Sequence, residues 1–343
     1  MGGEGDDYPA AYCRQVCHLL RCVRKVYDRR MAAETLLLVG DELGRYGFPT
    51  GHPLGSDRQG AFLASAVAKG LDKRVAIGAP RLATREELQR FHSREHLHWV
   101  EIRSRLGDGY LDYGDTPAFP GCYEIAATVA GTALEGLERV MAGDAVRTFQ
   151  PIGGLHHARR SRAAGFCVFN DLGVVIDSLR KRFGVARIGY VDIDVHHGDG
   201  IYYPYETDPD LIVVDIHEDG NFIFPGTGHA HESGANEAEG TKLNLPLPPG
   251  AGDREFFAAW ERGLAHLHHL KPQFLILQAG ADGLAGDPLA DLRCTPAVHA
   301  RVTRDLRKLA DEQCEGRLMA FGGGGYELSN LAAAWTAVLG ELT

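Results

Sequence analysis

The chain has 343 residues, of which 44% are hydrophobic and 24% charged, a composition typical of a globular protein with a large core. Lys and Arg number 36 against 46 Asp and Glu, so the net charge of −10 argues against a surface for nucleic acid, and we expect no nucleic-acid partner. No apolar stretch approaches the roughly 20 residues that span a bilayer, and the N-terminus is acidic rather than basic. We therefore expect no membrane partner and no secretion signal.

Seven cysteines, an odd number, do not suit a disulfide framework and favour a reduced, cytoplasmic compartment. Three of them, Cys13, Cys17 and Cys22, fall in residues 1–30, whose pattern predicts a helical N-terminal extension. Because no fourth ligand is nearby, these thiols favour a buried helix face over a metal site. Residues 31–343 contain no linker and no internal repeat, so we predict that they form one domain.

Short apolar runs alternate with amphipathic helices from Leu36 onward. In the second half, four apolar and partly β-branched runs predict strands buried on both faces of a parallel sheet: residues 187–194, 211–217, 274–279 and 317–321. Between them we predict helices over 253–270 and 295–312, the first capped by Asp253 and the second opened by Thr295 and Pro296. The alternation predicts an α/β fold, a mostly parallel sheet with helices on both faces. Ligands of such sheets bind beyond the carboxyl ends of the strands.

Residue types that ligate metals follow two of the predicted strands. Side chains alternate along a strand, so Asp192, Asp194 and His196 face the same way at the end of the first run. Asp282 follows the third run among small residues that let the backbone approach closely. One carboxylate and one imidazole of the first group, together with Asp282, make a three-ligand site with an open position, the catalytic arrangement for zinc. The alternative is that these acids cap helices and pair with arginines.

His156 and His157 are adjacent in a glycine-bearing loop. A water that attacks an amide at a metal needs a base, and the departing amine needs an acid; imidazole performs both tasks. Asp192 and Asp199 can each hold one ring through its second nitrogen, which fixes the tautomer and raises the basicity. Different surroundings would separate the pKa values of the two rings, and hence their roles.

Four glycines, Gly322 to Gly325, precede Tyr326 after the last predicted strand. No Lys-Ser or Lys-Thr follows them, so the pattern argues against a nucleotide-binding P-loop. The glycines allow the backbone to fold close to the site and to carry Tyr326 inward. A phenol there can donate a hydrogen bond to the oxyanion that forms on a substrate carbonyl.

With these residues, the chain from Gly51 to its end resembles the arginase-like-fold zinc deacetylases. This family includes histone deacetylases, bacterial acetoin-utilisation proteins and acetylpolyamine amidohydrolases. Six motifs carry the resemblance in the family's order: residues 153–158, 165–171, 192–199, 224–228, 280–288 and 322–326. The resemblance implies an arginase-like fold with its active site at the carboxyl ends of the strands. It also implies zinc-dependent hydrolysis of acyl amides that releases acetate.

The resemblance implies roles for single residues as well. The family's zinc ligands correspond to Asp194, His196 and Asp282, and its general base and acid to His157. His156, paired with Asp192, corresponds to the electrostatic partner, while Asp199 orients His157 and Tyr326 polarises the carbonyl together with the metal. The implied substrate-binding residues are two aromatic tunnel walls, a rim carboxylate for peptide N–H groups, and three further positions: Phe166, Phe224, Asp115, Gly165, Gly324 and Leu289.

The family also has a structural site for a monovalent cation, potassium, in which main-chain oxygens contribute. It corresponds to Asp192, Asp194, His196, Asp215 and Ile216. Asp215 stands where the family usually has a hydroxyl, a departure that affects the coordination of this ion.

Leu289 bears on the choice of substrate. Family members that act on acetylpolyamines have a glutamate there, just after the position of Gly286-Asp-Pro288, to recognise a distal ammonium. The uncharged Leu289 therefore favours N-ε-acyl-lysine in a protein or peptide, with an acetylpolyamine or another small amide as the alternative. The sequence leaves open the acyl length, zinc or iron as the metal, and whether the chain is a homo-oligomer.

Two other classes of protein compete with this interpretation. A binuclear manganese ureohydrolase shares the fold but needs further bridging carboxylates, and it has no use for the His-His pair or the Gly-Gly-Gly-Gly-Tyr motif. A catalytically silent acyl-lysine-binding scaffold usually lacks a ligand or the oxyanion donor, and none is missing here. His92, His96 and His98 are interpreted as core or surface residues rather than metal ligands.

Overall fold

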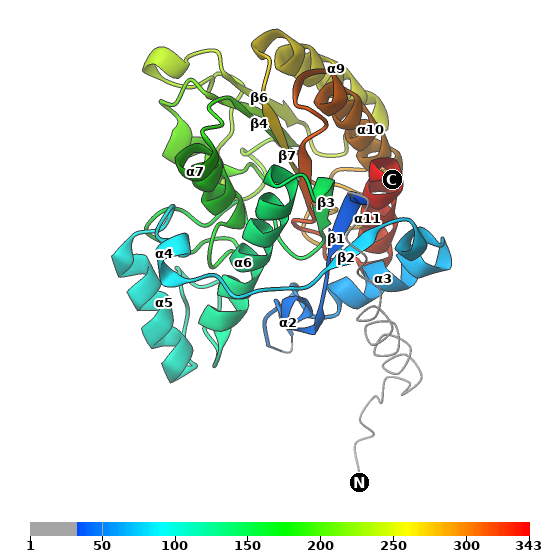
Figure 1. The fold of residues 1–343 in the computed structure, drawn as a ribbon. Coiled ribbons are helices and arrows are strands. Elements are labelled where there is room, and N and C mark those ends of the chain that lie inside the picture. The colour runs from blue at the N-terminus through cyan, green and yellow to red at the C-terminus, as the bar shows by residue number, and fades with distance from the viewer. Residues whose placement is uncertain (1–32, 50) are drawn as a thin grey trace. The chain divides into compact units, whose positions relative to one another are not determined.

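Eight parallel strands form the centre of the structure, a computed structural model that describes residues 33–49 and 51–343. They lie in the order β2-β1-β3-β8-β7-β4-β5-β6 (Figure 1). Their bounds are β1 Ala33–Leu38, β2 Ala76–Gly78, β3 Ala145–Gln150, β4 Ile188–Asp192, β5 Leu211–Glu218, β6 Lys242–Leu247, β7 Phe274–Gln278 and β8 Leu318–Phe321. The predicted α/β class is confirmed, and the sheet is parallel throughout. The predicted extension over residues 1–30, with its three cysteines, lies outside the described residues.

Helices cover both faces of the sheet (Figure 1). The α-helices are α2 Asp41–Gly44, α3 Arg58–Ala68, α4 Arg85–Leu88, α5 Arg94–Leu106, α6 Cys122–Met141, α7 Asp171–Phe183, α8 Asp199–Tyr202, α9 Asp253–Leu270, α10 Pro296–Gln313 and α11 Leu328–Leu342. Short 3-10 helices are η1 Leu71–Lys73, η2 Tyr203–Tyr205 and η3 Asn236–Ala238. Helices α6 and α7 contribute to the apolar core on one face, and α9, α10 and α11 to the core on the other.

The central strands β4, β7 and β8 are mainly apolar because both of their faces are covered. In β7, Phe274 and Ile276 belong to the core built with α6 and α7, whereas Leu275 and Leu277 belong to the core built with α9 to α11. Successive side chains of a strand point to opposite faces, so a strand covered on both sides needs a continuous apolar run. The predicted runs 187–194, 274–279 and 317–321 contain β4, β7 and β8, and the run 211–217 covers all of β5 except its last residue, Glu218.

The two long helices predicted in the second half are present as α9 and α10. Thr295 caps α10, its hydroxyl accepting a hydrogen bond from the N–H of Ala297, and Pro296 is the first helical residue, as predicted. The prediction that Asp253 caps α9 is wrong, because the cap position is Gly252 and Asp253 is already helical. The Asp253 carboxylate instead accepts the Thr295 N–H at 2.7 Å and its hydroxyl at 2.6 Å, which ties the starts of the two helices together.

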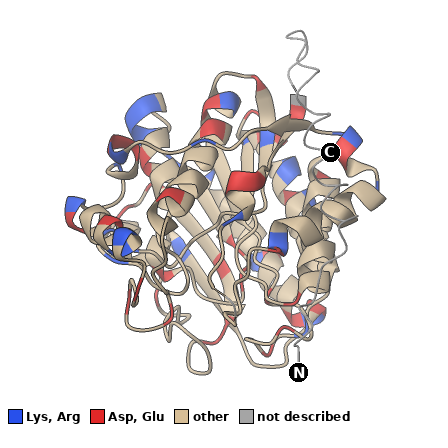
Figure 2. Ribbon diagram, turned by 90° about the horizontal axis from the view of Figure 1, so that it is seen from below, with Lys and Arg blue, Asp and Glu red and all other residues tan. Residues whose placement is uncertain are grey.

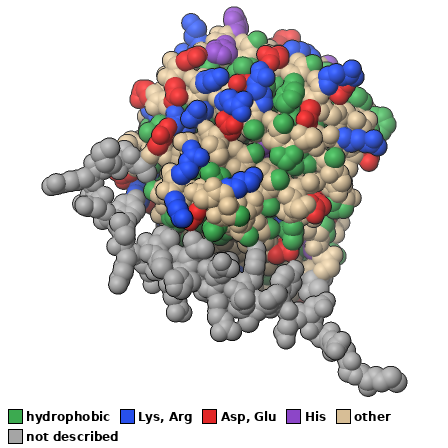
Figure 3. All heavy atoms as spheres, turned by 90° about the vertical axis from the view of Figure 1, so that its right-hand side faces the viewer, with side chains coloured by type: hydrophobic (Ala, Val, Ile, Leu, Met, Phe, Trp, Pro, Cys, Tyr) green, Lys and Arg blue, Asp and Glu red, His purple; other side chains and the backbone are tan. Residues whose placement is uncertain are grey.

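Acidic and basic residues are mixed on the outer helices (Figure 2). The face shown in Figure 3 likewise mixes acidic, basic and apolar side chains. Ion pairs link α10 to its neighbours: Arg301 to Glu261 of α9 at 2.7 Å and Arg304 to Glu341 of α11 at 2.6 Å. Each exposed pair contributes about 1 kcal/mol or less, so apolar packing attaches these helices. Among the described residues, no helix combines the length and the apolar character needed to cross a membrane.

Candidate active site

The candidate site lies where four neighbouring strands end. β3, β8, β7 and β4 are adjacent and parallel, so the loops that follow them meet at one edge of the sheet. The loop after β3 carries the two adjacent histidines, and the loop after β8 carries Tyr326. The loop after β7 carries Asp282, and β4 leads directly into Asp194 and His196. Chain segments far apart in sequence thus deliver the predicted residues to one place.

Asp194, His196 and Asp282 come together as the sequence predicts. All three are buried, and one donor atom of each lies within 4.8 Å of the other two. His196 Nδ1 is 3.1 Å from Asp194 Oδ1 and 3.3 Å from Asp282 Oδ2. The Asp282 Oδ2 atom is buried, yet it accepts no hydrogen bond from the described residues. An imidazole and two carboxylate oxygens turned to one point, one of them without a hydrogen-bond donor, fit a divalent cation.

The other two carboxylate oxygens of this cluster are fixed by the surrounding fold. Asp194 Oδ2 accepts hydrogen bonds from Gln278 Nε2 and from the Gly324 N–H, each at 2.8 Å. Asp282 Oδ1 accepts the N–H of Val195 at 3.0 Å. Asp194 and Asp282 therefore each have one carboxylate oxygen held by hydrogen bonds from the surrounding structure and the other facing His196. Sequence reasoning missed Gln278, because an amide at the end of a strand carries no metal-binding signature.

Each adjacent histidine is held by one carboxylate, as predicted. His156 Nδ1 lies 2.8 Å from Asp192 Oδ2, and His157 Nδ1 lies 2.8 Å from Asp199 Oδ1. Because both contacts use Nδ1, Nε2 of each ring is left for the site. Arg159 donates to Asp199 Oδ2 from Nε at 3.0 Å and from Nη2 at 2.5 Å. This arginine, which sequence reasoning did not single out, fixes the carboxylate that fixes His157.

The two rings differ in protonation. Burial lowers the pKa of His156, but the carboxylates of Asp192 and Asp194 outweigh burial and raise that pKa to about 10. Burial and the neighbouring His156 lower the pKa of His157 to about 4. At neutral pH His156 is therefore protonated and His157 is neutral, a separation of the kind expected from the sequence. Of the two, only the neutral ring can take up a proton.

The glycine-rich loop after β8 brings Tyr326 to the same site as the two histidines. The Tyr326 N–H donates to Asp287 Oδ2 at 2.8 Å. The guanidinium of Arg58, which is 4% exposed, donates to the carbonyl oxygens of Gly325 at 3.1 Å and Gly323 at 2.5 Å. A carboxylate and a buried guanidinium thus fix the loop. Sequence reasoning assigned no role to either residue, although Asp287 lies within the motif 280–288.

A small cavity of about 20 Å³ lies among these groups. Its lining residues are Leu54, Gly154, Leu155, His156, His157, Gly165, Cys167, Asp194, His196, Gly323, Gly324 and Tyr326. A Cβ atom on Gly324 would lie 2.0 Å from Asp282 Oδ2, and one on Gly165 would lie 2.5 Å from His157 Cδ2. Both glycines are therefore needed to leave the cavity open. Its volume is close to that of one water-sized probe.

The two predicted aromatic walls flank different parts of the site. The ring centroid of Phe224 is 4.9 Å from that of His157 and 6.3 Å from that of His196. The ring centroid of Phe166 is 5.9 Å from that of Tyr326. Phe224 is therefore beside the proposed base and metal, and Phe166 beside the proposed oxyanion donor.

The backbone around the histidines and Phe166 is held by residues outside the predicted site. Phe166 has a φ of 65°, in the left-handed region that non-glycine residues rarely adopt. Its N–H donates to Thr116 Oγ1 at 3.1 Å, and its carbonyl accepts the Tyr46 hydroxyl at 2.7 Å. Asp171 accepts the N–H groups of residues 154–155 at 2.9 and 2.8 Å. Sequence reasoning missed Asp171, although it ends the motif 165–171.

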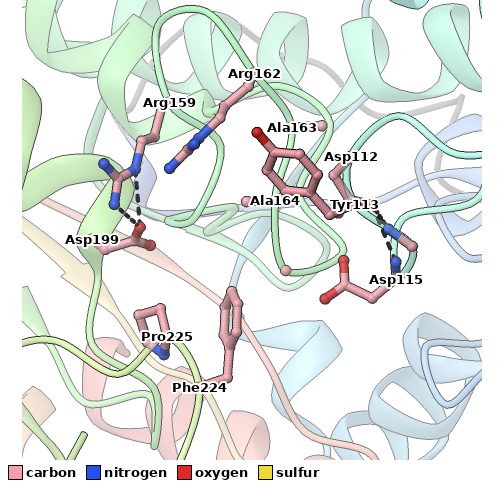
Figure 4. A pocket seen from close by; sticks show the side chains of 12 residues that line it. Asp112, Tyr113, Asp115, Arg159, Arg162, Ala163, Ala164, Asp199, Phe224 and Pro225 are labelled. Atoms are coloured by element: carbon pink, nitrogen blue, oxygen red, sulfur yellow. Dashed lines mark hydrogen bonds and ion pairs between the residues drawn. The ribbon is translucent and has the colours of Figure 1, made fainter.

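Figure 4 shows a second, larger pocket of about 370 Å³. Gly165 lines both spaces, so the pocket adjoins the cavity. Asp115, the predicted rim carboxylate, and Phe224 also line the pocket. Partial loss of solvent and a hydrogen bond with Asp112 raise the pKa of Asp115 to about 7. Leu289 is 38% exposed and does not line this pocket.

The residues predicted to hold a monovalent cation adjoin one another across β4 and β5. Asp192 pairs with Asp215 in the sheet register, and Ile216 follows in β5. Asp215 Oδ2 accepts the Gly198 N–H at 2.9 Å, and Asp215 Oδ1 is 2.5 Å from His217 Nδ1. Burial lowers the pKa of His217, but the Asp215 carboxylate outweighs burial and raises it. The acid at this position is thus paired with the ring of His217.

The histidines that we interpreted as core or surface residues do not belong to the cluster of Asp194, His196 and Asp282. His92 and His96 are buried, and His98 is exposed. His92 Nε2 accepts the N–H of Asn170 at 2.8 Å, and His96 Nε2 donates to the Val168 carbonyl at 3.0 Å. These two rings support the loop that precedes α7.

Comparison with known proteins identifies relatives over almost the whole described chain. Residues 52–342 match the family model described as "Histone deacetylase domain". The chain is 35% identical to the acetoin utilization protein AcuC of Bacillus subtilis over 275 residues, which are 78% of this chain and 71% of that protein. It is 34% identical to histone deacetylase 8 of Xenopus tropicalis over 277 residues, 78% of this chain and 73% of that one. The crystal structure of the HDA15 HD domain matches with a TM-score of 0.83 and 30% identity, covering 91% of this chain and 88% of that chain.

Proposed function

The chain belongs to the histone deacetylase family, and from that premise we propose that it hydrolyses N-ε-acetyl-lysine in a protein or peptide, releasing acetate and free lysine. One observation carries the proposal. His157, held by Asp199, lines the same small cavity as Tyr326, beside the cluster of Asp194, His196 and Asp282. A base, a hydrogen-bond donor for an oxyanion and a set of metal ligands are the groups that amide hydrolysis needs.

His157 acts first as base and then as acid. Because its pKa is low, the ring is neutral and accepts a proton from the attacking water. It then gives that proton to the nitrogen of the departing lysine amine. Asp199 holds Nδ1 at 2.8 Å and thereby keeps Nε2 as the reacting nitrogen. Arg159 holds Asp199 in turn.

Tyr326 and His156 stabilise the charge that develops on the substrate. The phenol of Tyr326 keeps its proton, because burial raises its pKa well above the ordinary value, and it donates a hydrogen bond to the carbonyl oxygen. The protonated ring of His156, paired with Asp192, adds a fixed positive charge beside the reacting atoms. Asp287 and Arg58 position the loop that carries Tyr326.

Asp194, His196 and Asp282 are the residues that would hold the metal, which we propose to be zinc. When bound, zinc supplies a Lewis acid that polarises the amide carbonyl and lowers the pKa of water. The same donors also suit Fe²⁺. Metal analysis of the purified protein distinguishes the candidates: one zinc per chain is expected, and two manganese ions per chain would favour a ureohydrolase.

The dimensions of the site support an acetyl group on a lysine stem. A cavity of about 20 Å³ favours a small acyl group over a long chain. The rings of Phe166 and Phe224 suit the methylene groups of a lysine side chain. Leu289 offers no charge to a distal ammonium, which supports lysine over an acetylpolyamine.

We also propose a structural potassium ion beside β4 and β5. Main-chain oxygens there, with the carboxylates of Asp192 and Asp215, would hold it, and a higher melting temperature in potassium chloride than in choline chloride is the expected sign. A reduced, cytoplasmic location is part of the same proposal. It is supported by the free, buried cysteines of the described residues, which are Cys122, Cys167, Cys294 and Cys314.

The activity is tested with the purified full chain on acetyl-lysine peptides and acetylated polyamines, after chelation and after zinc is returned. We expect acetate release from the peptides that chelation abolishes and zinc restores. In His157→Ala, zinc should stay bound while turnover falls by about 10²–10⁴-fold. Release from polyamines alone would favour the alternative substrate. Bound zinc without release from any substrate would favour a silent scaffold.

A further inference from the structure

The pocket of about 370 Å³, which we call the mouth, contains two charged groups, Arg162 and Asp115, that take no part in the proposed hydrolysis. It is lined by residues of three loops, around Asp115, Arg159 to Gly165, and Phe224, and by Asp199 at the start of α8. Figure 4 shows Arg159 and Arg162 on one side of this pocket and Asp115 on the other. Because Gly165 lines both this pocket and the small cavity, the two spaces adjoin, and the residues beside a lysine that enters the cavity would lie in or near this pocket.

The loop after His157 presents two guanidinium groups on one side. Arg159 and Arg162 are paired in an antiparallel bridge, with the Arg159 N–H donating to the Arg162 carbonyl at 2.9 Å. Residues paired directly across an antiparallel bridge project to the same face. The loop therefore holds both arginines in a defined position three to six residues before Gly165.

The two arginines differ in how their charge is compensated. Arg159 donates twice to Asp199 Oδ2, and its guanidinium lies 4.8 Å from the ring centroid of Tyr203. Its charge is thus already matched by a carboxylate. Arg162 is exposed, and its guanidinium has no hydrogen bond or ion pair with any described residue. Arg162 is therefore the uncompensated cation of the pocket.

The acids on the opposite side cannot neutralise Arg162. Asp112 Oδ1 accepts the N–H groups of residues 114–116 at 3.0 to 3.1 Å, and Asp112 Oδ2 accepts the Thr116 hydroxyl. Asp112 is therefore engaged within its own loop. Asp115 Oδ1 lies 3.3 Å from the same hydroxyl, and no arginine in the described part of the chain forms an ion pair with it. The mouth thus has a cationic side and an anionic side with open space between them.

We propose that the mouth selects peptides with an acidic side chain close to the acetyl-lysine, whose carboxylate Arg162 binds. The inference rests on the proposed function and specifies its substrate class. A planar guanidinium without a partner is the group that recognises a carboxylate by paired hydrogen bonds. A pocket of about 370 Å³ beside Gly165 has room for a neighbouring side chain in addition to the lysine stem. Asp115 on the far side fixes the direction of the peptide.

The test is a set of acetyl-lysine peptides with Glu, Gln or Lys placed singly at each of the two positions before and after the acetyl-lysine. For at least one position we expect Glu to raise kcat/KM about two- to fivefold over Gln, the range of an exposed ion pair, and Lys to lower it. The preference for Glu should weaken at high salt. It should vanish in Arg162→Gln and reverse in Arg162→Glu. Because Arg162 is exposed, both variants should fold.

Arg74→Glu is the matched control. Arg74 is exposed and precedes β2, so it lies at the amino edge of the sheet, away from the mouth, and the variant should keep the preference for Glu. Equal kcat/KM for Glu and Gln peptides at every position, or a preference that survives in Arg162→Glu, would overturn the inference. If no peptide is hydrolysed, the proposed function fails. The ratio of Kd values for the Glu and Gln peptides then still decides whether Arg162 binds the carboxylate.

Discussion

The floor of the site and its mouth are built in opposite ways. At the floor, Asp194, His196 and Asp282 are buried, their carboxylates are held by backbone and side-chain donors, and the cavity measures about 20 Å³. At the mouth, Tyr113 is 97% exposed, the guanidinium of Arg162 has no partner among the described residues, and the pocket measures about 370 Å³.

This difference separates the reaction from the choice of substrate. Groups that move protons or hold a metal must keep their positions within fractions of an ångström, so the fold surrounds them with fixed partners. Groups that choose among peptides act through exposed contacts of modest energy. Substitutions at the floor should therefore change turnover by orders of magnitude for every peptide. Substitutions at the mouth should change KM several-fold.

The largest effect is expected when the floor loses a proposed metal ligand. Asp282→Ala removes the carboxylate oxygen that faces His196 at 3.3 Å, so the variant should bind no zinc and release acetate only at the background rate. Metal analysis of the purified chain measures the first effect and an acetate assay the second. Asp210→Ala, an exposed acid in the turn before β5, should keep its metal and activity. Full zinc occupancy in Asp282→Ala would contradict the ligand assignment.

The next largest effect is expected from a substitution that slows the reaction without changing metal binding at the floor. Tyr326→Phe removes the proposed donor to the carbonyl oxygen and leaves the proposed metal ligands intact, so turnover should fall about 10²–10³-fold while zinc content stays unchanged. Tyr123→Phe, on α6, serves as the matched control and should behave like the original chain. A Tyr326→Phe variant with undiminished turnover would refute the proposed role of the phenol.

A third substitution lies at the junction of floor and mouth. In Gly165→Ala the added Cβ would lie 2.5 Å from His157 Cδ2 and 2.9 Å from Phe224 Cε1, so the base must shift. We expect kcat/KM to fall about 10²-fold for all peptides. Gly184→Ala has a similar left-handed backbone, with φ of 66° against 53°, but open space around it. It should cost about 1 kcal/mol of stability and no activity, and equal losses in both variants would show that backbone strain alone matters.

The sheet could be predicted where its strands are covered on both faces. Such strands need apolar residues on both faces, and β4, β7 and β8 appear in the sequence as mainly apolar runs whose polar residues stand at the carboxyl end. The cap of α9 was predicted wrongly because Asp253 is a good capping residue locally. Its carboxylate is instead taken by Thr295, 42 residues away in sequence, and that contact exists only in the folded chain.

The candidate site could be predicted where a residue type itself carries the chemistry. Histidines and acids in the loops after strands, such as His157 and Asp194, predict proton transfer or metal binding. The residues that sequence reasoning missed act on backbone groups: Asp171 on two amides of the histidine loop, and Arg58 on carbonyls of the glycine loop. Nothing in the local sequence tells which backbone groups will face such a side chain, since the fold alone brings them together.

The smallest expected effect is a pH dependence confined to the mouth. Partial loss of solvent and the neighbouring Asp112 raise the pKa of Asp115 to about 7, so this carboxyl is mostly protonated at pH 6 and mostly ionised at pH 8. An ionised carboxylate accepts a peptide N–H more strongly than a neutral carboxyl does. KM for an acetyl-lysine peptide should therefore fall about fivefold from pH 6 to pH 8, beyond any change seen in Asp115→Asn. Because the variant keeps every group of the floor, the ratio of the two KM profiles isolates Asp115. A ratio that stays constant with pH would mean that Asp115 does not titrate at the mouth, and the contrast between floor and mouth would then rest on Arg162 alone.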